Sequence, residues 1–184
     1  MNQHFGASAV ASVLFYLPFI RQVLLWCGAI PSDARSIKEA MKTRNLSILP
    51  GGIAELFLSS REKEAVFMKH RTGIIRISLE QRAPILPIYM FGNTQFFDQA
   101  GFSFSRISRS LKMSLTFFYG QYYLPIPYPT KSVIVMGRPL DLPPGNSKEA
   151  IEAVQTQWIS EVKRLYNTYK HLANYPADKE LEIH

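Results

Sequence analysis

The sequence predicts an α/β domain in which helices pack on a central, mostly parallel sheet. Short apolar runs that end in glycine or proline alternate with segments of helical periodicity. Apolar residues make up 47% of the 184-residue chain, which is enough to fill a core, and this length suits one domain. We divide that domain into an apolar leading segment (7–30), an α/β core (31–145), a terminal helix (147–171) and a tail (172–184).

Composition narrows the choice of partners. The net charge of +7 fits an anionic membrane surface or a ligand with several phosphates. Nucleic acid ranks below both, because the basic residues are scattered and neither an RNA-binding aromatic motif nor zinc-ligand spacing accompanies them. Cys27 is the only cysteine, so it cannot form an internal disulfide, and we expect it to be a small buried apolar residue.

The leading segment, 7–30, is predicted to be an apolar helix, or two short helices hinged at Pro18. It is long enough to cross a bilayer, and no secretory signal precedes it. However, Arg21 stands near its middle, where a charge at the bilayer centre costs about 3 kcal/mol or more. We therefore expect a buried or interfacial helical segment rather than a spanning helix.

The first half of the core should alternate helices with strands. Ser32 or Asp33 can cap a helix that runs to Arg44. The hydrophobic pattern then predicts a strand at 46–49, a strand at 64–68, a helix from Thr72 and a buried strand within 84–91.

The stretch from 93 to 130 is less regular and rich in phenylalanine. Arg106, Arg109 and Lys112 recur at spacings of three, which predicts a basic face on a helix. Such a helix beside aromatic residues suits a membrane surface, but an ordinary solvated face over a core fits equally well. The proline-rich run 124–129 should be an extended connection.

The chain should end in a strand and a long helix. Residues 132–136 form the predicted strand, and Ser147 can cap the helix. Its apolar stripe, which we expect to pack on the domain, consists of Ile151, Val154, Trp158, Val162, Leu165 and Tyr169.

Two motifs can bind a small polar ligand. The strand at 46–49 ends in Pro50-Gly51-Gly52, where paired glycines let a ligand approach the backbone, and Glu55 follows one turn later. Arg71 and Arg76 flank Gly73 at the start of the predicted helix. A helix start with arginines can bind phosphate, although a solvated helix start fits the same residues.

These motifs belong to a wider pattern that resembles the type-2 diacylglycerol and monoacylglycerol acyltransferases and their wax-synthase relatives. The most recognisable pieces are Gly-Gly-x-x-Glu, ending at Glu55, and the Arg-x-Gly block at Arg71. Four stretches follow the family's order: 17–31, 49–55, 71–92 and 124–140. The resemblance implies a glycerolipid acyltransferase-like fold, here incomplete at the N-terminus.

The resemblance also implies a reaction and a location. Such an enzyme transfers a fatty acyl group from acyl-CoA, its co-substrate, to the hydroxyl of a diacylglycerol or monoacylglycerol, without a metal or cofactor. It works at the endoplasmic reticulum membrane and on lipid droplets. Gly51 and Gly52 would offer backbone N–H groups, Glu55 would orient the acceptor hydroxyl, and Arg71 and Arg76 beside Gly73 would meet the phosphates of coenzyme A. The oligomeric state stays open.

Two departures from the family pattern matter. The His-Pro-His-Gly block that supplies the family's base does not occur in the sequence, so the catalytic residue is unknown. His70 is the only internal substitute, and we expect it instead to be a polar residue at a strand end. Arg82 stands where the family usually has glycine, which predicts a local change of backbone.

The missing block leaves two alternatives to a neutral-lipid acyltransferase. One is a catalytically inactive fragment or pseudoenzyme that still binds lipid or membrane. The other is a lysophospholipid acyltransferase, which would share the fold. The His-x-x-x-x-Asp block of that second family is also absent, and Gly-Gly-x-x-Glu fits the neutral-lipid enzymes better.

Overall fold

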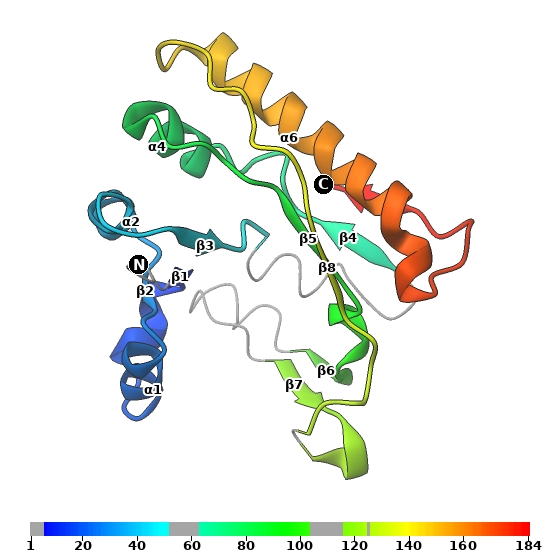
Figure 1. Ribbon diagram of the computed structural model, residues 1–184. Coiled ribbons are helices and arrows are strands. Elements are labelled where there is room, and N and C mark those ends of the chain that lie inside the picture. Colours follow the sequence, from blue (N-terminus) through cyan, green and yellow to red (C-terminus); the bar gives the residue numbers. More distant parts are fainter. Residues whose placement is uncertain (1–5, 52–62, 104–115, 125) are drawn as a thin grey trace, which may run out of the picture.

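A computed structural model describes residues 6–51, 63–103, 116–124 and 126–184. Figure 1 shows an N-terminal part with α1 and α2, and a larger part in which the long helix α6 runs beside β5 and β8. The strands β6 and β7 extend below that ribbon, toward the same end of the molecule as α1.

The N-terminal part is a three-stranded parallel sheet with the order β2-β1-β3. Its strands are β1 (Ala7–Val10), β2 (Ile30–Pro31) and β3 (Leu46–Ile48). The crossover from β1 to β2 contains a short 3₁₀ helix, η1 (Ser12–Tyr16), and α1 (Ile20–Trp26). The two short helices hinged near Pro18 are therefore confirmed, whereas the start of the leading segment is a strand because it pairs with β3.

We expected a buried or an interfacial leading segment, and burial is wrong for its helices. None of the residues of η1 or α1 is buried, and Phe19 and Trp26 expose 89% and 77% of their surface. Cys27 is exposed too, because it follows directly at the end of α1. Among the described helices, none is both long and apolar enough to cross a membrane.

Helix α2 (Ala34–Met41) begins where the sequence predicts. The side chain of Asp33 accepts a hydrogen bond from the backbone N–H of Ser36 at 2.9 Å, which makes Asp33 the cap. Helix α4 (Gly73–Gln81) packs against α2 and α6, and buries Ile75, Ile77, Ser78 and Leu79. Both helices thus lie between the N-terminal sheet and the main core.

The strand predicted within 84–91 is β5 (Ile88–Phe91), which pairs antiparallel with β8 (Val133–Met136). The expectation of a fully buried strand is wrong. Tyr89 and Phe91 face the core, whereas Ile88 and Met90 are 51% and 37% exposed. The reason is that α6 covers one face of this ribbon only (Figure 1).

Helix α6 (Lys148–Tyr169) organises the main core, as its apolar stripe predicts. Ser147 caps it by accepting a hydrogen bond from the N–H of Ala150 at 3.2 Å. A short 3₁₀ helix, η4 (Lys170–Ala173), follows, and the chain then returns as β9 (Leu181–Ile183) beside β4 (Glu64–Val66). The segment that we expected to be a tail is therefore part of a parallel strand pair.

The remaining elements connect these parts. Two short 3₁₀ helices, η2 (Asn93–Gln95) and η3 (Gln121–Tyr123), flank the antiparallel pair β6 (Asp98–Ser103) and β7 (Thr116–Tyr119). The described strands form four small sheets, of which two are parallel and two antiparallel. The fold is mixed α/β as predicted, but a single, mostly parallel central sheet is not what these strands form.

Candidate functional site

The two ligand-binding motifs of the sequence meet in space. Gly51 follows β3 and is buried, and its carbonyl oxygen accepts a long hydrogen bond, 3.4 Å, from Nη2 of Arg71. The Arg71 guanidinium also lies 5.2 Å from the centre of the Phe67 ring, so it stacks on an aromatic face. These contacts hold an exposed cation at the junction of β3 and α4.

The start of α4 is open to solvent. Thr72 precedes its first residue and its side chain makes no capping hydrogen bond. The next residue, Gly73, is exposed, and a Cβ atom added there would meet nothing within 4 Å. Unpaired N–H groups and the positive end of the helix dipole make such a start suitable for an anion.

Arg76 lies in the first turn of the same helix and is exposed. The structure therefore brings Gly51, Arg71, Gly73 and Arg76 to one end of α4. Gly52 and Glu55 lie outside the described residues, and their predicted roles remain predictions. The same holds for Arg106, Arg109 and Lys112.

Histidine does not complete this site in the described part of the chain. His70 is exposed, with its ring centre 6.1 Å from that of Phe67, as expected for a polar residue beyond a strand. His184 lies 3.1 Å from a carboxylate oxygen of Glu182, close to the end of the chain. Among the described residues, His, Cys, Asp and Glu form no group of three that could hold a metal ion.

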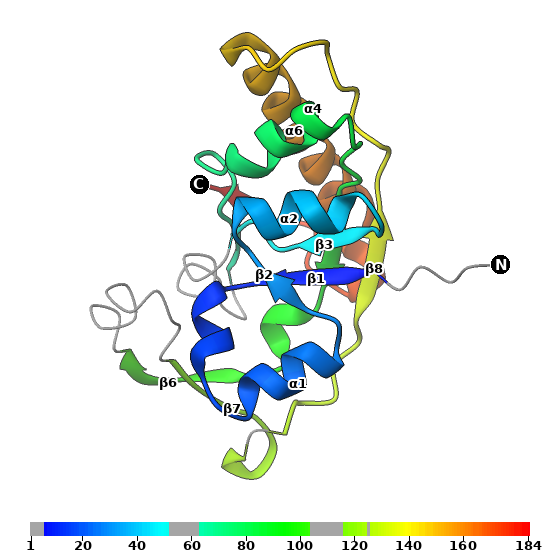
Figure 2. The ribbon, with the colours of Figure 1, turned by 90° about the vertical axis from the view of Figure 1, so that its left-hand side faces the viewer.

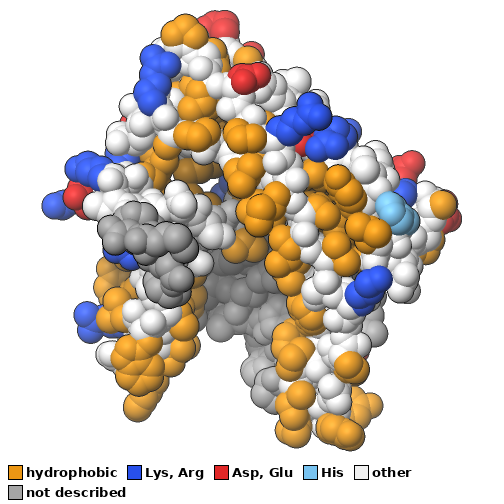
Figure 3. All heavy atoms as spheres, in the orientation of Figure 1, with side chains coloured by type: hydrophobic (Ala, Val, Ile, Leu, Met, Phe, Trp, Pro, Cys, Tyr) orange, Lys and Arg blue, Asp and Glu red, His pale blue; other side chains and the backbone are white. Residues whose placement is uncertain are grey.

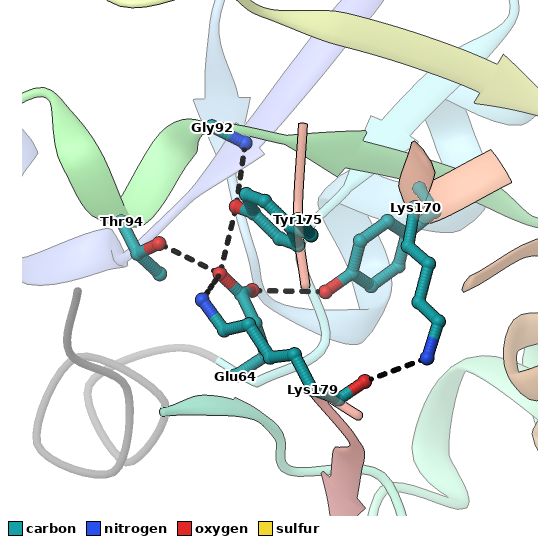
Figure 4. Close-up of polar contacts among 7 residues, drawn as sticks. Glu64, Gly92, Thr94, Lys170, Tyr175 and Lys179 are labelled. Carbon is teal, nitrogen blue, oxygen red and sulfur yellow. Dashed lines mark hydrogen bonds and ion pairs between the residues drawn. The ribbon is translucent and has the colours of Figure 1, made fainter. Parts of the chain in front are cut away.

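A second polar cluster is buried beneath β5 (Figure 4). Its centre is the carboxylate of Glu64, the first residue of β4, which is only 3% exposed. Tyr89 donates its hydroxyl to one oxygen at 3.0 Å. Tyr175 and Thr94 donate their hydroxyls to the other oxygen, each at 2.8 Å.

Lys179 compensates the charge of this buried carboxylate. Its Nζ lies 3.4 Å from Oε1 of Glu64, and the lysine side chain is 10% exposed. The Tyr175 hydroxyl also accepts a hydrogen bond from the backbone N–H of Gly92 at 2.9 Å. Because four donors already use its oxygens, Glu64 is a structural anchor rather than a free base.

The tyrosines around Glu64 stay protonated at neutral pH. Burial, and then the negative charge of Glu64, raise the pKa of the Tyr175 hydroxyl to about 12. The same two causes raise the pKa of Tyr89 further above its usual range. Both hydroxyls therefore remain hydrogen-bond donors to the carboxylate.

Sequence reasoning missed this cluster. Its members lie on β4, on β5 and the turn after it, and in the segment expected to be a tail; the Glu64–Lys179 pair spans 115 residues. The only local signal is a carboxylate that opens the apolar run Ala65–Val66, where a buried charge requires a partner.

Comparison with known proteins gives one consistent answer. A family model described as diacylglycerol acyltransferase matches residues 7–184. The human acyl-CoA wax alcohol acyltransferase 2 is 27% identical over 92% of this chain and 56% of its own length. The mouse diacylglycerol O-acyltransferase 2-like protein 6 is 26% identical over 92% and 57%, and the zebrafish (Danio rerio) diacylglycerol O-acyltransferase 2 is 25% identical over 92% and 53%.

The chain thus spans a little over half the length of the curated relatives that it matches. No solved structure matches it.

Proposed function

This chain belongs to the diacylglycerol acyltransferase family, and from that premise we propose that it serves acyl transfer from acyl-CoA to the hydroxyl of a lipid. One observation carries the proposal: the family match runs from residue 7 to the last residue. The geometry adds support, because the motifs that the family resemblance singled out converge at Gly51 and Arg71.

The acceptor is the finer part of the proposal. The relatives' names include both wax alcohol and diacylglycerol acyltransferases, so their acceptors share a hydroxyl on a long-chain lipid. We propose a diacylglycerol or monoacylglycerol, which is the acceptor that the resemblance of the sequence implies. We propose the endoplasmic reticulum membrane or a lipid droplet surface as the place of the reaction, because acceptors of this kind reside in membranes and droplets.

The open start of α4 is the proposed binding place for the coenzyme A phosphates. Arg71 and Arg76 would each offer a guanidinium, whose paired N–H groups match two phosphate oxygens. Gly73 leaves space above the first turn, so a phosphate can approach the N–H groups there. No metal or cofactor is required for this arrangement.

The chemistry still needs a base. A base removes the acceptor's hydroxyl proton while its oxygen attacks the thioester carbonyl; the carbon–sulfur bond then breaks, and the coenzyme A thiolate takes up a proton. The sequence holds no His-Pro-His-Gly block to supply that base. A second candidate function is binding of acyl-CoA or lipid without turnover, which the open helix start and its exposed arginines would serve without a base.

Turnover separates the two candidates. The purified chain is incubated with radiolabelled acyl-CoA and vesicles containing diacylglycerol, beside the product of the longest transcript from the same locus. We expect labelled triacylglycerol from any product that carries the histidine block. If such a product binds acyl-CoA yet forms no acylated lipid, the acyltransferase proposal is wrong. Lysophospholipid in place of diacylglycerol tests the lysophospholipid alternative.

Binding tests the site itself. Arg71→Ala should weaken coenzyme A binding about tenfold or more, because a charge-assisted contact to phosphate is lost. Arg44→Ala is the control, since it removes one exposed positive charge beyond the end of α2. Equal affinities of the two variants in equilibrium dialysis would show that the phosphates bind elsewhere.

A further inference from the structure

The loop between η1 and α1 contains an unusual tight turn. The N–H of Ile20 donates to the carbonyl of Pro18 at 2.8 Å, and Phe19 between them has φ 65° and ψ −51°. These angles define a γ-turn of the rare, strained form. Its central residue is a phenylalanine that is 89% exposed.

A second strained turn lies about a hundred residues later, in η3. The N–H of Leu124 donates to the carbonyl of Gln121 at 3.0 Å, and the two central residues, Tyr122 and Tyr123, both have φ of 58°. Two central residues with positive φ make a type I′ turn, which favours asparagine and glycine. Here both are tyrosines, 82% and 86% exposed.

The two turns share a feature that packing does not explain. The described chain has five residues other than glycine with positive φ, and three of them are these exposed aromatic residues. Bulky side chains avoid such angles, and strained residues of this kind cluster where a protein contacts a ligand. Their rings are nevertheless held out in solvent rather than in the core.

Both turns sit within larger apolar tips, which we call the aromatic prongs. The first prong comprises Tyr16, Phe19, Ile20, Val23 and Trp26, and the second comprises Tyr122, Tyr123, Leu124 and Ile126. Figures 1 and 2 show that η1–α1 and the segment after β7 project toward the same end of the molecule in both views. Figure 3 shows two separate lobes with hydrophobic side chains at their ends.

The charges around the prongs identify the partner. Residues 6–32 and 116–140 contain no aspartate or glutamate, whereas Arg21 and Lys131 are exposed within them. On the neighbouring strand β6, Asp98 accepts a hydrogen bond from Tyr128 at 3.0 Å. The segments that form the prongs thus carry exposed aromatic rings, exposed aliphatic side chains and only positive charges of their own, which matches an anionic lipid surface: rings enter the headgroup layer and cations meet phosphates.

We propose that the two aromatic prongs form a bipartite footprint on an anionic membrane surface, with Phe19 and the Tyr122–Tyr123 pair as its inserted tips. This deepens the proposed function, because it names the surface that meets the membrane holding the acceptor lipid. Vesicle binding requires no turnover, so the footprint can be tested, and can fail, independently of acyl transfer.

Glycine substitution at the strained positions gives a sharp test. Phe19→Gly removes one inserted ring, and a Tyr122→Gly/Tyr123→Gly double variant removes two. Glycine adopts positive φ without strain, and in the double variant this gain offsets the lost stacking of Tyr123 on Tyr119, whose ring centres are 5.5 Å apart, so both variants should keep the fold. The matched control is Asn174→Gly, because Asn174 is exposed with the same φ of 58° but lies outside both prongs.

Flotation of the full chain with vesicles of phosphatidylcholine and phosphatidylserine provides the readout. We expect the wild type and Asn174→Gly to float, and each prong variant to bind about tenfold more weakly because it loses buried apolar surface. The fluorescence of Trp26 provides a second readout. In a Trp158→Phe variant Trp26 is the only tryptophan, and brominated lipids should quench its fluorescence.

Three results would overturn the proposal. The first is that the prong variants float as well as the wild type, and the second is that brominated lipids leave the fluorescence of Trp26 unchanged. The third is that the chain does not bind vesicles but self-associates in sedimentation, and that the prong variants abolish this self-association. The last result would mean that the prongs bind a second copy of the chain instead of a membrane.

Discussion

Arg82 ends α4 in a left-handed conformation, with φ 52° and ψ 33°. The family resemblance predicted a change of backbone here, because glycine is usual at this position. The structure shows instead that Arg82 keeps the conformation that suits glycine. A side chain in this region costs about 1 kcal/mol, so the residue stores strain at the helix end.

We therefore predict that Arg82→Gly stabilises the protein by about 1 kcal/mol, since glycine adopts this conformation freely. The measurement is urea unfolding followed by circular dichroism. A loss of stability would mean that the arginine side chain contributes contacts worth more than the strain.

Tyr175 links the C-terminal segment to Glu64 and to Gly92. Burial and the charge of Glu64 raise the pKa of its hydroxyl from 10.0 to about 12. The folded state thus holds this proton more tightly than the unfolded state. The resulting stabilisation is complete below pH 10 and disappears as the pH rises from 10 to about 12.

Tyr175→Phe should remove the part of the stability loss at alkaline pH that comes from ionisation of this hydroxyl. At neutral pH we expect it to cost about 1–3 kcal/mol, because a buried carboxylate and a backbone N–H each lose a partner. Unfolding free energies at neutral and alkaline pH measure both effects. Identical alkaline losses in wild type and variant would contradict the role given to this hydroxyl.

Single residues were predictable where their signals are local. Gly51 and Arg71, which are hydrogen-bonded in the structure, each belong to a motif that is visible in the sequence. Ser147 is recognisable as a cap because its helix follows it directly. The partners of Glu64 were not predictable, because Lys179 lies 115 residues away and belongs to a polar segment that looks like an ordinary tail.

Among the elements, α6 is fixed to the strand ribbon by more than its apolar stripe. Glu161 accepts a hydrogen bond from the backbone N–H of Arg138, in the turn after β8, at 3.0 Å. Arg164, one turn along the helix, donates to the same carboxylate at 2.7 Å. These hydrogen bonds, that of Arg164 first, lower the pKa of Glu161 from 4.5 to about 2.

The sign of the resulting pH dependence is clear. A depressed pKa stabilises the folded state above pH 4.5, and this contribution is lost as the pH falls from 4.5 toward about 2. We predict that Glu161→Gln, which removes the titrating group, loses less stability than the wild type over this range. Parallel urea titrations at neutral and acidic pH check the prediction, and equal acid losses would refute it.

Helices were easier to predict than strands. The helices that begin at Ala34 and Lys148 are predicted by a capping residue and by apolar periodicity, and both signals are local in the sequence. Strands β1 and β9 each have three or four residues and exist only through partners, β3 and β4, that other parts of the chain supply. Their sequences contain no signal that identifies those partners.

For the whole molecule, the largest difference from the prediction is in the number of sheets and in how their strands pair. Alternating strands and helices predicted one mostly parallel sheet, yet the described strands form four small sheets of both kinds. Antiparallel pairing of β5 with β8 joins strands that have 41 residues, 92–132, between them in the sequence. Periodicity reveals strands but not which strands become neighbours.

At the scale of the whole molecule, the two proposed functional regions lie on different elements. The open start of α4 would bind the phosphates of acyl-CoA, and the aromatic prongs at the end shown at the bottom of Figure 1 would meet the lipid surface. The buried cluster at Glu64 ties β4, β5 with the turn after it, and the segment before the C-terminal strand into one core.

The most direct test of the central claim is hydrogen exchange of the backbone amides with and without coenzyme A. Bound phosphates should slow exchange in residues 72–75, because the N–H groups at the start of α4 have no intrahelical acceptor until that of Arg76, which donates to Thr72. Arg71→Ala should abolish this protection, whereas Arg44→Ala should retain it. Unchanged exchange across 72–75, while coenzyme A binds and protects another segment, would contradict phosphate binding at the start of α4.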